Sequence, residues 1–242
     1  MTTGPARTRP TARRNLENAL RRAGHMCVAG VDEVGRGCLA GPVTAAAVVL
    51  DPDRPITGLR DSKLLTPDAR ARLHDRIVHR AVAWRVVSRS VADIDALNIH
   101  RASLAAMLDA VLGLHPAADY VLADGFAIPG LLVPHQGLVK GDQRCACIAA
   151  ASIVAKVTRD RLMVAMDQED PRYGYARHKG YATAEHLAAI RQHGLSDAHR
   201  RSFRRATLFD LLIDDDDIPV ADEHSRGTEP PGRTVPPPWA DG

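Results

Sequence analysis

Residues 27 to 44 constrain the fold more than any other stretch of this chain. The apolar run Val28–Val31 leads directly into two adjacent acids, Asp32 and Glu33, and a second apolar run extends from Val43 to Leu50. Apolar runs of this length, bracketed by glycine and proline, are typical of buried strands. Only a short glycine-rich connection separates the two runs. The pattern therefore predicts an antiparallel hairpin at the centre of the fold.

The connection between the two runs carries residues of the kind that take part in a reaction. Asp32 and Glu33 stand at the end of a buried strand, where charges are costly without a cation, an arginine or a helix N-terminus as partner. In Gly35-Arg36-Gly37 the glycines allow close approach of the backbone to a ligand, and the arginine can bind a phosphate through its planar fork of donors. The combination favours metal-dependent chemistry on a phosphate ester. A charged surface turn between two strands has the same pattern.

One geometric condition follows from strand geometry. Neighbouring side chains on a regular strand face opposite sides. Asp32 and Glu33 can therefore share one site only if the strand ends or bends there, which Gly35 and Gly37 favour.

The rest of the chain alternates helical and strand patterns. A helix is expected over residues 15–24, and Thr66 with Pro67 is a helix-start signal. Together these patterns predict an α/β domain with a mixed sheet. The further expected elements are strands at 84–91, 120–125 and 136–140, and helices at 92–114, 144–168 and from Thr183 to 193.

Two more aspartates end apolar runs beside glycine, as Asp32 does. Asp124 precedes Gly125, and Asp142 follows Gly141. Strand ends in an α/β sheet meet at one edge, where clustered acids need cations, and oxygen ligands suit Mg²⁺ or Mn²⁺. Taken separately, Asp124 is also consistent with a turn and Asp142 with a helix N-cap. Asp160, inside the long helix, fits an ion pair with a neighbouring base better than a metal ligand.

Composition and charge define the limits of the folded unit. The chain has 242 residues, 45% of them hydrophobic, enough for one domain with tails. We expect a disordered tail over 1–14, a catalytic domain over 15–213 and an acidic, proline-rich disordered tail over 214–242. Residues 211–242 carry a net charge of −6, which leaves +9 on residues 1–210. A basic body favours a polyanionic partner.

The chain shows no sign of export or membrane insertion. It has no run of about 18 apolar residues and no apolar signal block at its N-terminus. Its four cysteines lack CxxC spacing, which favours reduced thiols in a cytoplasmic protein. We expect a monomer without membrane attachment.

The motifs together resemble those of bacterial ribonuclease HII. The resemblance begins at Gly30-Val-Asp32-Glu33-Val-Gly35-Arg36-Gly37 and continues through Gly41-Pro42-Val43. It covers about residues 25 to 205, and only about 25 residues precede the first motif, whereas ribonuclease HIII has a substantial extra N-terminal domain. The further matching segments, in order, are Asp61-Ser62-Lys63, Ala123-Asp124-Gly125, Lys140-Gly141-Asp142, 148–160, His178-Lys179-Gly180-Tyr181 and 199–203.

The resemblance implies a fold and a reaction. The fold is ribonuclease H-like, a central mixed β-sheet flanked by helices with a C-terminal helical segment. The reaction is hydrolysis of the RNA strand of RNA–DNA hybrids, with incision 5′ to single ribonucleotides in duplex DNA and products bearing 5′-phosphate and 3′-hydroxyl ends. By position, the catalytic, metal-binding acids that would hold Mg²⁺ or Mn²⁺ are Asp32, Glu33, Asp124 and Asp142.

The resemblance also assigns substrate contacts. Gly35, Arg36 and Gly37 match the family's sensor of the ribose 2′-hydroxyl, the group that distinguishes RNA from DNA. Tyr181 matches the tyrosine that stacks on the sugar at the RNA–DNA junction. Charge alone suggests three further phosphate contacts, namely Lys63, Arg200 and Arg201.

Two other functions remain open from the residues. A DNA-directed nuclease or recombinase on the same fold could share the acids, but it has no need of a 2′-hydroxyl sensor. A non-catalytic module that binds hybrids would be expected to lack a carboxylate, and all four are present.

Overall fold

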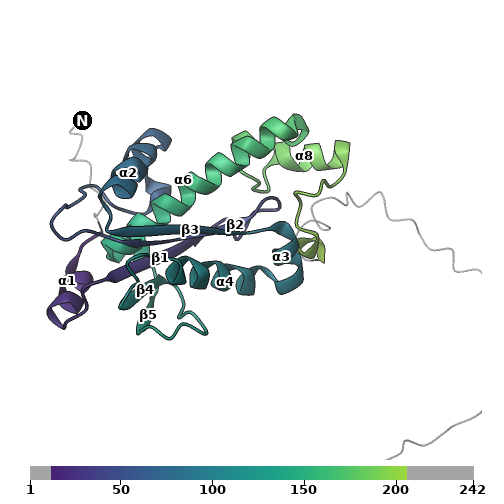
Figure 1. The fold of residues 1–242 in the computed structure, drawn as a ribbon. Coiled ribbons are helices and arrows are strands. Elements are labelled where there is room, and N and C mark those ends of the chain that lie inside the picture. The colour runs from purple at the N-terminus through teal and green to yellow at the C-terminus, as the bar shows by residue number, and fades with distance from the viewer. Residues whose placement is uncertain (1–11, 206–242) are drawn as a thin grey trace, which may run out of the picture.

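The computed structural model describes residues 12–205, which form one five-stranded mixed sheet with helices on both faces (Figure 1). The strand order is β3-β2-β1-β4-β5. β1 pairs antiparallel with β2 and parallel with β4, so the predicted hairpin forms the centre of the sheet. The strands are β1 (Val28–Val34), β2 (Val43–Val49), β3 (Ala83–Arg89), β4 (Tyr120–Asp124) and β5 (His135–Leu138).

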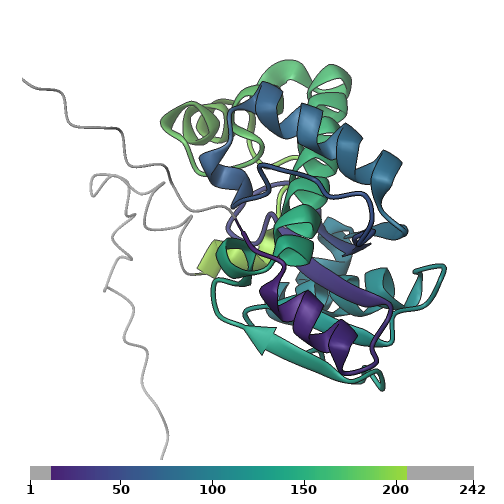
Figure 2. The same ribbon diagram turned by 90° about the vertical axis from the view of Figure 1, so that its left-hand side faces the viewer.

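The long helix α6 and helix α2 cover one face of the sheet, and α4 covers the other, as the two views in Figures 1 and 2 show. Helix α8 lies beyond the far end of α6. The helices are α1 (Asn15–Arg22), α2 (Pro67–Arg80), α3 (Val91–Leu97), α4 (Ile99–Leu112), α5 (Gly141–Arg144), α6 (Ala146–Glu169), α7 (Tyr175–His178) and α8 (Ala184–His193). Short 3-10 helices span Ser62–Leu64, Pro171–Tyr173 and Arg201–Arg205.

Helix α6 lies unusually close to β1. A Cβ atom on Gly30 of β1 would stand 2.2 Å from the backbone carbon of Cys147, so only glycine fits there. The run Ala149–Ala151 on the helix is fully buried and small enough for this approach. The side chains of α6 that follow this run are therefore held directly above the strand that carries Asp32.

The first helix caps the long one. Cys145, at the N-cap of α6, makes no side-chain capping hydrogen bond. Instead Oε1 of Glu17 on α1 accepts a 2.8 Å hydrogen bond from the backbone amide of Cys147. A carboxylate at a helix N-terminus satisfies a free amide and opposes the helix dipole. The helix expected at 15–24 is thus confirmed and has a structural role.

An opening forms at one edge of the sheet because β1 separates from β4. β1 pairs with β4 only from Val28 to Val31, yet it stays paired with β2 as far as Val34. β4 ends at Asp124, one residue after this ladder stops, whereas β1 continues to Val34, so the carboxyl end of β4 leaves space beside β1. Ligands of open α/β sheets bind at such edges.

The helix predicted over 92–114 is wrong as a single element. The structure has α3 and α4, separated by Asn98 with a φ of 68°. The Asn98 side chain accepts a 3.1 Å hydrogen bond from the amide of Arg101 and so caps the second helix. With a ψ of 161°, this backbone conformation is one that residues other than glycine rarely adopt, so the packing and the cap around Asn98 must hold the break in place.

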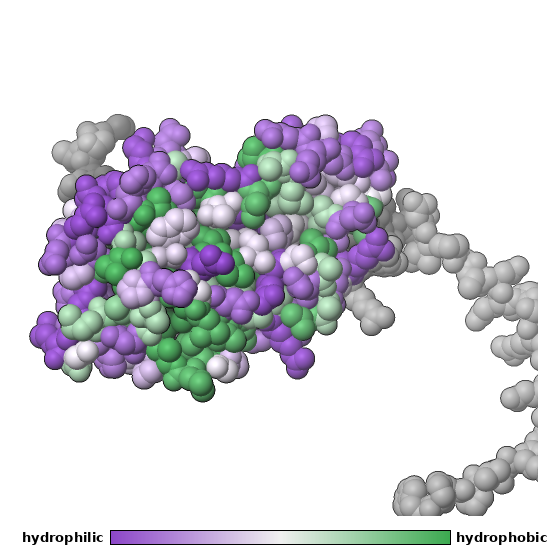
Figure 3. Space-filling model, in the orientation of Figure 1, coloured by the Kyte–Doolittle hydropathy of each residue, from purple (hydrophilic) through white to green (hydrophobic). Residues whose placement is uncertain are grey.

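The break changes which residues face the core. Leu97, at the end of α3, and Leu112, at the end of α4, are 41% and 62% exposed. Phe126 and Leu132 in the β4–β5 connection are also exposed, and Figure 3 shows hydrophobic surface in that region of the molecule. Within residues 12–205, no helix has the length and apolar character needed to cross a membrane.

Part of the N-terminal segment that was expected to be disordered is packed against the domain. Residues 12–14, assigned from the sequence to a disordered segment, belong to the packed unit. The Ala12 amide donates to the Leu59 carbonyl, and Arg13 forms a β-bridge with Cys145. Residues 1–11, the predicted boundary at 213 and the acidic tail over 214–242 lie outside the described residues.

Candidate active site

A pocket of about 230 Å³ opens at the edge where β1 and β4 separate. Nine of the eleven site residues expected from the sequence line it, and Arg200 and Arg201 do not. The acids reach it from β1, β4 and α5. Its lining residues are Asp32, Glu33, Val34, Gly35, Arg36, Gly37, Ser62, Lys63, Asp124, Asp142, Ser152, Lys156 and Tyr181.

The two acids of β1 share this pocket although the strand does not end at them. β1 continues in register to Val34, so an early strand end at Asp32 is wrong. Asp32 is 6% exposed, and its Oδ1 accepts a 2.7 Å hydrogen bond from the Glu33 amide. Glu33 Oε1 accepts from the Arg36 guanidinium at 3.1 Å. Arg36 thus neutralises one acid while lining the same pocket.

The other two acids are tied together through the backbone. Asp124 ends β4, and its Oδ1 accepts a 2.7 Å hydrogen bond from the amide of Gly141. Asp142 lies inside the first turn of α5, where Lys140 occupies the N-cap position in a left-handed conformation. The alternative of Asp142 as an N-cap is therefore wrong. Its buried side chain lines the pocket instead.

Burial and mutual repulsion disfavour the charged forms of these acids. Burial raises the pKa of Asp32 well above its usual range, and the charges of Glu33 and Asp124 raise it further. Burial also raises the pKa of Glu33, against the opposing effect of Arg36. The pKa of Asp142 is raised to about 6 by burial and then by Asp61 and Asp124. The site holds more negative charge than its own bases neutralise.

A divalent cation fits this donor set. The pocket offers carboxylate oxygens, and no histidine or cysteine is among its lining residues. Within residues 12–205, no three His, Cys, Asp or Glu side chains already stand close enough to hold an ion by themselves. Mg²⁺ retains several waters and is usually held by one or two carboxylates plus substrate phosphates, so an open, incomplete set of ligands suits it.

The Gly35-Arg36-Gly37 turn combines close packing with open space. Gly35 has a φ of 94°, and a Cβ there would stand 2.2 Å from Nε of Arg159. A Cβ on Gly37 would meet nothing within 4 Å, so this position faces open space beside the pocket. The first glycine is needed by the fold, whereas the second leaves backbone accessible to a ligand.

Lys156 is a pocket residue that was not singled out from the sequence. Its Nζ lies 5.9 Å from the ring centroid of Tyr181, which is 40% exposed. Asp160, one turn further along α6, accepts a 2.7 Å hydrogen bond from Lys156 and pairs with Arg70 at 3.6 Å. Asp160 does not line the pocket. The spacing of four residues between Lys156 and Asp160 was the available signal.

Two serines line the pocket beside the acids. The hydroxyls of Ser62 and Ser152 lie 3.0 Å apart, and Ser152 also hydrogen-bonds to the Asp32 carboxylate. Asp61 accepts from the amide of Lys63 at 2.9 Å, which fixes the turn that presents Lys63 to the pocket. The Asp61-Ser62-Lys63 segment was recognised from the sequence, but the role of Ser62 was not.

The arginine pair at 200 and 201 is divided by the structure. Arg201 is exposed, with its guanidinium 3.7 Å from Asp197. Arg200 is only 2% exposed and donates to the carbonyls of Gly41 and Arg36. The expectation that Arg200 contacts a phosphate therefore does not agree with its placement, because its donors are already used inside the protein.

Two solved structures have a fold similar to that of this chain. Ribonuclease H2 from Pyrococcus horikoshii matches with a TM-score of 0.64 at 25% identity, over 77% of this chain and 97% of that one. A ribonuclease HIII designated Bst, solved in complex with Mn²⁺, matches with a TM-score of 0.59 at 20% identity, over 80% of this chain and 71% of that one. The mixed sheet with helices on both faces is thus the ribonuclease H-like fold, as predicted.

Fold and sequence likeness define a nuclease of the ribonuclease H class. The family model described as Ribonuclease HII matches residues 29–206. Ribonuclease HII of Thiobacillus denitrificans is 56% identical over 185 residues, which are 76% of this chain and 91% of that protein. The chain belongs to the ribonuclease HII family. It is an endoribonuclease that degrades the RNA of RNA–DNA hybrids, and its family depends on divalent metal ions.

Proposed function

We propose that the pocket at the β1–β4 edge is the active site and that its four acids, Asp32, Glu33, Asp124 and Asp142, bind two divalent cations. The supporting observation is that carboxylates from β1, β4 and α5 line one pocket together with the Gly-Arg-Gly turn. Bound there, the cations supply an activated water and stabilise the leaving oxygen of a phosphodiester. The products carry 5′-phosphate and 3′-hydroxyl ends.

The chain's own groups select and orient the substrate. Gly35, Arg36 and Gly37 contact the ribose 2′-hydroxyl, since the backbone at Gly37 is open to the pocket. Tyr181, half-exposed beside Lys156, stacks on the sugar at an RNA–DNA junction, which allows incision 5′ to a single ribonucleotide in duplex DNA.

Whether a basic side chain is assigned a phosphate contact depends on its exposure to the pocket or to solvent. Lys63 and Lys156 line the pocket and can neutralise the phosphates on either side of the cut. Arg201 is exposed and is assigned to flanking duplex, whereas Arg200 is buried and is not.

The same proposal covers the metal ion, the oligomeric state, the location in the cell and the limits of the catalytic domain. The ion is Mg²⁺ or Mn²⁺, in keeping with oxygen ligands and with the Mn²⁺ in the similar ribonuclease HIII. The enzyme acts as a monomer on its nucleic-acid substrate. It acts in the cytoplasm, in keeping with four free cysteines. The catalytic domain expected over 15–213 also includes residues 12–14, which pack against it.

Cleavage of an end-labelled DNA duplex with one ribonucleotide tests the proposal. We expect one cut, 5′ to the ribonucleotide, that requires Mg²⁺ or Mn²⁺ and is abolished by EDTA. Asp124→Asn should lower the rate by about 100-fold or more, given that even outer partners of metal ligands cost 10- to 100-fold. Asp53→Asn, an exposed aspartate outside the pocket, is the matched control. Equal cutting of an all-DNA duplex would instead identify a DNA nuclease, and binding without cutting would identify a hybrid-binding module.

A further inference from the structure

Arg200 is a buried charge whose side-chain hydrogen bonds all go to one turn of the chain, while its guanidinium also lies 5.2 Å from the centroid of the Phe203 ring. Its Nε and Nη2 donate to the Gly41 carbonyl at 3.0 and 2.9 Å, and its Nη1 donates to the Arg36 carbonyl at 3.0 Å. Burial lowers the pKa of Arg200 to about 10, so the side chain remains charged at neutral pH. One guanidinium thus bridges the tip and the end of the 35–41 turn.

The bond to Arg36 controls the next peptide group. The Arg36 carbonyl and the Gly37 amide belong to one planar, trans peptide unit, in which C=O and N–H point in opposite directions. When Arg200 holds the carbonyl on the protein side, the Gly37 amide is directed to the other side. That side is open, since Gly37 lines the pocket and a Cβ there would meet nothing.

The backbone around Arg200 ties the same turn to the C-terminal segment. The Arg200 amide donates to the Leu39 carbonyl at 2.9 Å, and the Gly41 amide donates to the Ala198 carbonyl at 2.8 Å. Arg200 therefore does not reach the turn from a flexible surface position. It is held in register with the turn by a short antiparallel pairing, which includes the Ala40–His199 bridge.

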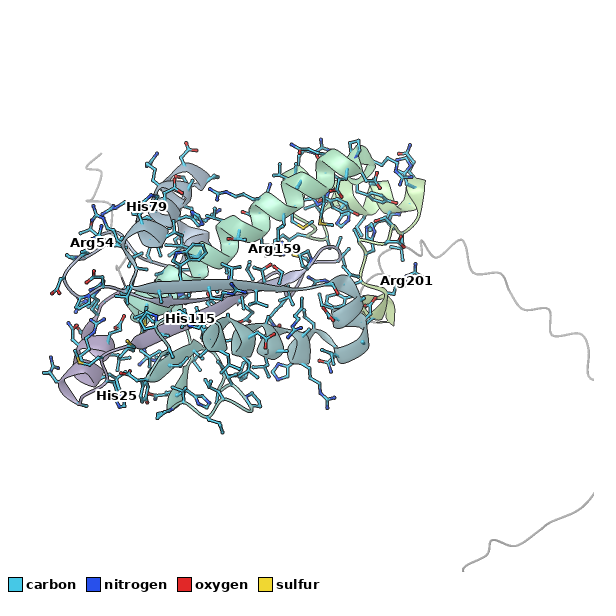
Figure 4. The ribbon with its side chains drawn as sticks, viewed as in Figure 1. His25, Arg54, His79, His115, Arg159 and Arg201 are labelled. Carbon is cyan, nitrogen blue, oxygen red and sulfur yellow. The ribbon has the colours of Figure 1, made fainter. Side chains whose placement is uncertain are left out.

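A second buried arginine fixes the other end of the turn. Arg159 of α6 is fully buried and donates to the carbonyls of Ala40, Pro42 and Lys179. Figure 4 shows it between the long helix and the strands. Arg159 thereby joins the end of the turn to the segment before Tyr181, while the peptide at Arg36 is held by Arg200. The two arginines act on different parts of the turn.

We propose that Arg200 is a positioning residue that orients the Arg36–Gly37 peptide for recognition of the ribose 2′-hydroxyl. The inference rests on the proposed function of the Gly-Arg-Gly turn and extends it to a residue outside the pocket. Arg200 acts through this peptide and touches neither substrate nor metal. Its neighbour Arg201, which is exposed, has no such role.

Steady-state kinetics of Arg200→Met and Arg200→Lys on a duplex with one ribonucleotide test this role. Both variants should lower kcat by about 10- to 100-fold, the cost of small misplacements in an active site. Lysine retains the charge but lacks the fork that bridges two carbonyls, so it should not restore the rate. Arg54→Met, an exposed arginine far from the turn in Figure 4, should keep wild-type kcat.

The salt dependence of KM separates positioning from phosphate contact. Loss of a phosphate contact reduces the slope of log affinity against log salt by about one. We expect an unchanged slope for both Arg200 variants. A slope reduced by about one with kcat retained would overturn the proposal, as would wild-type kcat in a folded variant.

Thermal unfolding of each variant provides the control for folding. Rates are compared per folded enzyme, so a purely structural role would lower the melting temperature but leave kcat unchanged, and this result would also overturn the proposal. If Arg200→Met shows no cooperative transition, Arg200→Lys decides by the same criteria. Wild-type enzyme that cuts the all-DNA duplex equally would show that the sugar-sensing function itself fails, independently of Arg200.

Discussion

Asp124 Oδ1 accepts a 2.7 Å hydrogen bond from the backbone amide of Gly141, the residue immediately before Asp142. This bond joins the end of β4 to the start of α5 and so fixes two of the four pocket acids relative to each other. A Cβ on Gly141 would stand 2.6 Å from Ile148 Cδ1 and 3.2 Å from Asp124 Oδ1, so both of these side chains would have to shift to admit it.

Gly141→Ala should therefore weaken metal binding without removing any carboxylate. Displacement of Asp124 or α5 by the added methyl group should raise the Mg²⁺ concentration for half-maximal cleavage by about 10- to 100-fold. The measurement is a Mg²⁺ titration of the cleavage rate, with the melting temperature as a check on folding. An unchanged Mg²⁺ requirement in the folded variant would contradict the proposed role of this contact.

Lys156 and Asp160 should have separable effects although they form one ion pair. Loss of a charged hydrogen bond to a phosphate costs about 1.5–3 kcal/mol, so Lys156→Met should raise KM about 10- to 100-fold. Asp160→Asn removes only the partner that orients Lys156, and its effect on KM should be smaller.

The Mg²⁺ requirement of the Asp160→Asn variant shows whether Asp160 orients Lys156 or binds the metal ion itself. Because Asp160 lies outside the pocket lining, Asp160→Asn should keep the wild-type Mg²⁺ titration curve. A shift as large as that of Gly141→Ala would instead identify Asp160 as a metal ligand. Lys156→Arg, which keeps the charge, is the matched control for the KM effect.

Two buried histidines should make the fold sensitive to acid. His186 and His199 are almost fully buried, with their Nε2 atoms 3.1 Å apart. The Tyr181 carbonyl accepts from His186 Nδ1, and the Ser196 amide donates to His199 Nδ1. These two bonds assign one proton to each ring, with His199 Nε2–H donating to His186. Both rings are therefore neutral, and a further proton on either would break the chain of bonds.

The pH dependence of unfolding tests this arrangement. Burial lowers the pKa of both His186 and His199 to about 4, below the usual 6.5. The unfolded chain then binds more protons between these values, so stability is full above about pH 6.5 and falls as the pH drops toward 4. Urea unfolding over this range should show the loss, and His186→Gln should reduce its slope. The exposed His79→Gln should not, and an equal effect of both variants would contradict the assignment.

Glu17 should stabilise the fold from outside the site. It is 2% exposed and supplies the cap that α6 lacks. Glu17→Ala leaves the amide of Cys147 buried without its partner, which should cost about 1–3 kcal/mol of unfolding free energy. Urea denaturation measures this cost. Glu185→Ala, which removes an exposed ion pair with Arg177, is the control, and a comparable loss there would contradict the capping role.

The parts of the site that strands supply could be predicted from the sequence. Apolar runs that end in Asp32 and Asp124 beside glycine indicate strand ends at one edge, and both acids line the pocket. Of the two alternatives stated for Asp32 and Glu33, a strand that ends there or one that bends there, the first is wrong, because β1 stays paired with β2 as far as Val34. β1 separates from β4 while it remains paired with β2, and this depends on tertiary packing rather than on local sequence.

Residues contributed by α6 were harder to predict. The first half of this helix is buried almost throughout, so periodicity does not show which side chains reach the pocket. Ser152 and Lys156 do so because Gly30 lets the helix approach β1. Charge was equally ambiguous for Arg200 and Arg201. Adjacent arginines have the same formal charge, and only the backbone carbonyls around Arg200 separate a buried contact from an exposed one.

The uninterrupted course of β1 into the Gly-Arg-Gly turn has a consequence for how this enzyme can change. Asp32 and Arg36 are four residues apart on one rigid segment, whose pairing with β2 is continuous to Val34. A slip of one residue in a strand moves every side chain to the opposite face. An insertion or deletion here would therefore displace the acids and the turn together. The two acids of β1 and the turn that is proposed to select the sugar should therefore tolerate no change of length between them.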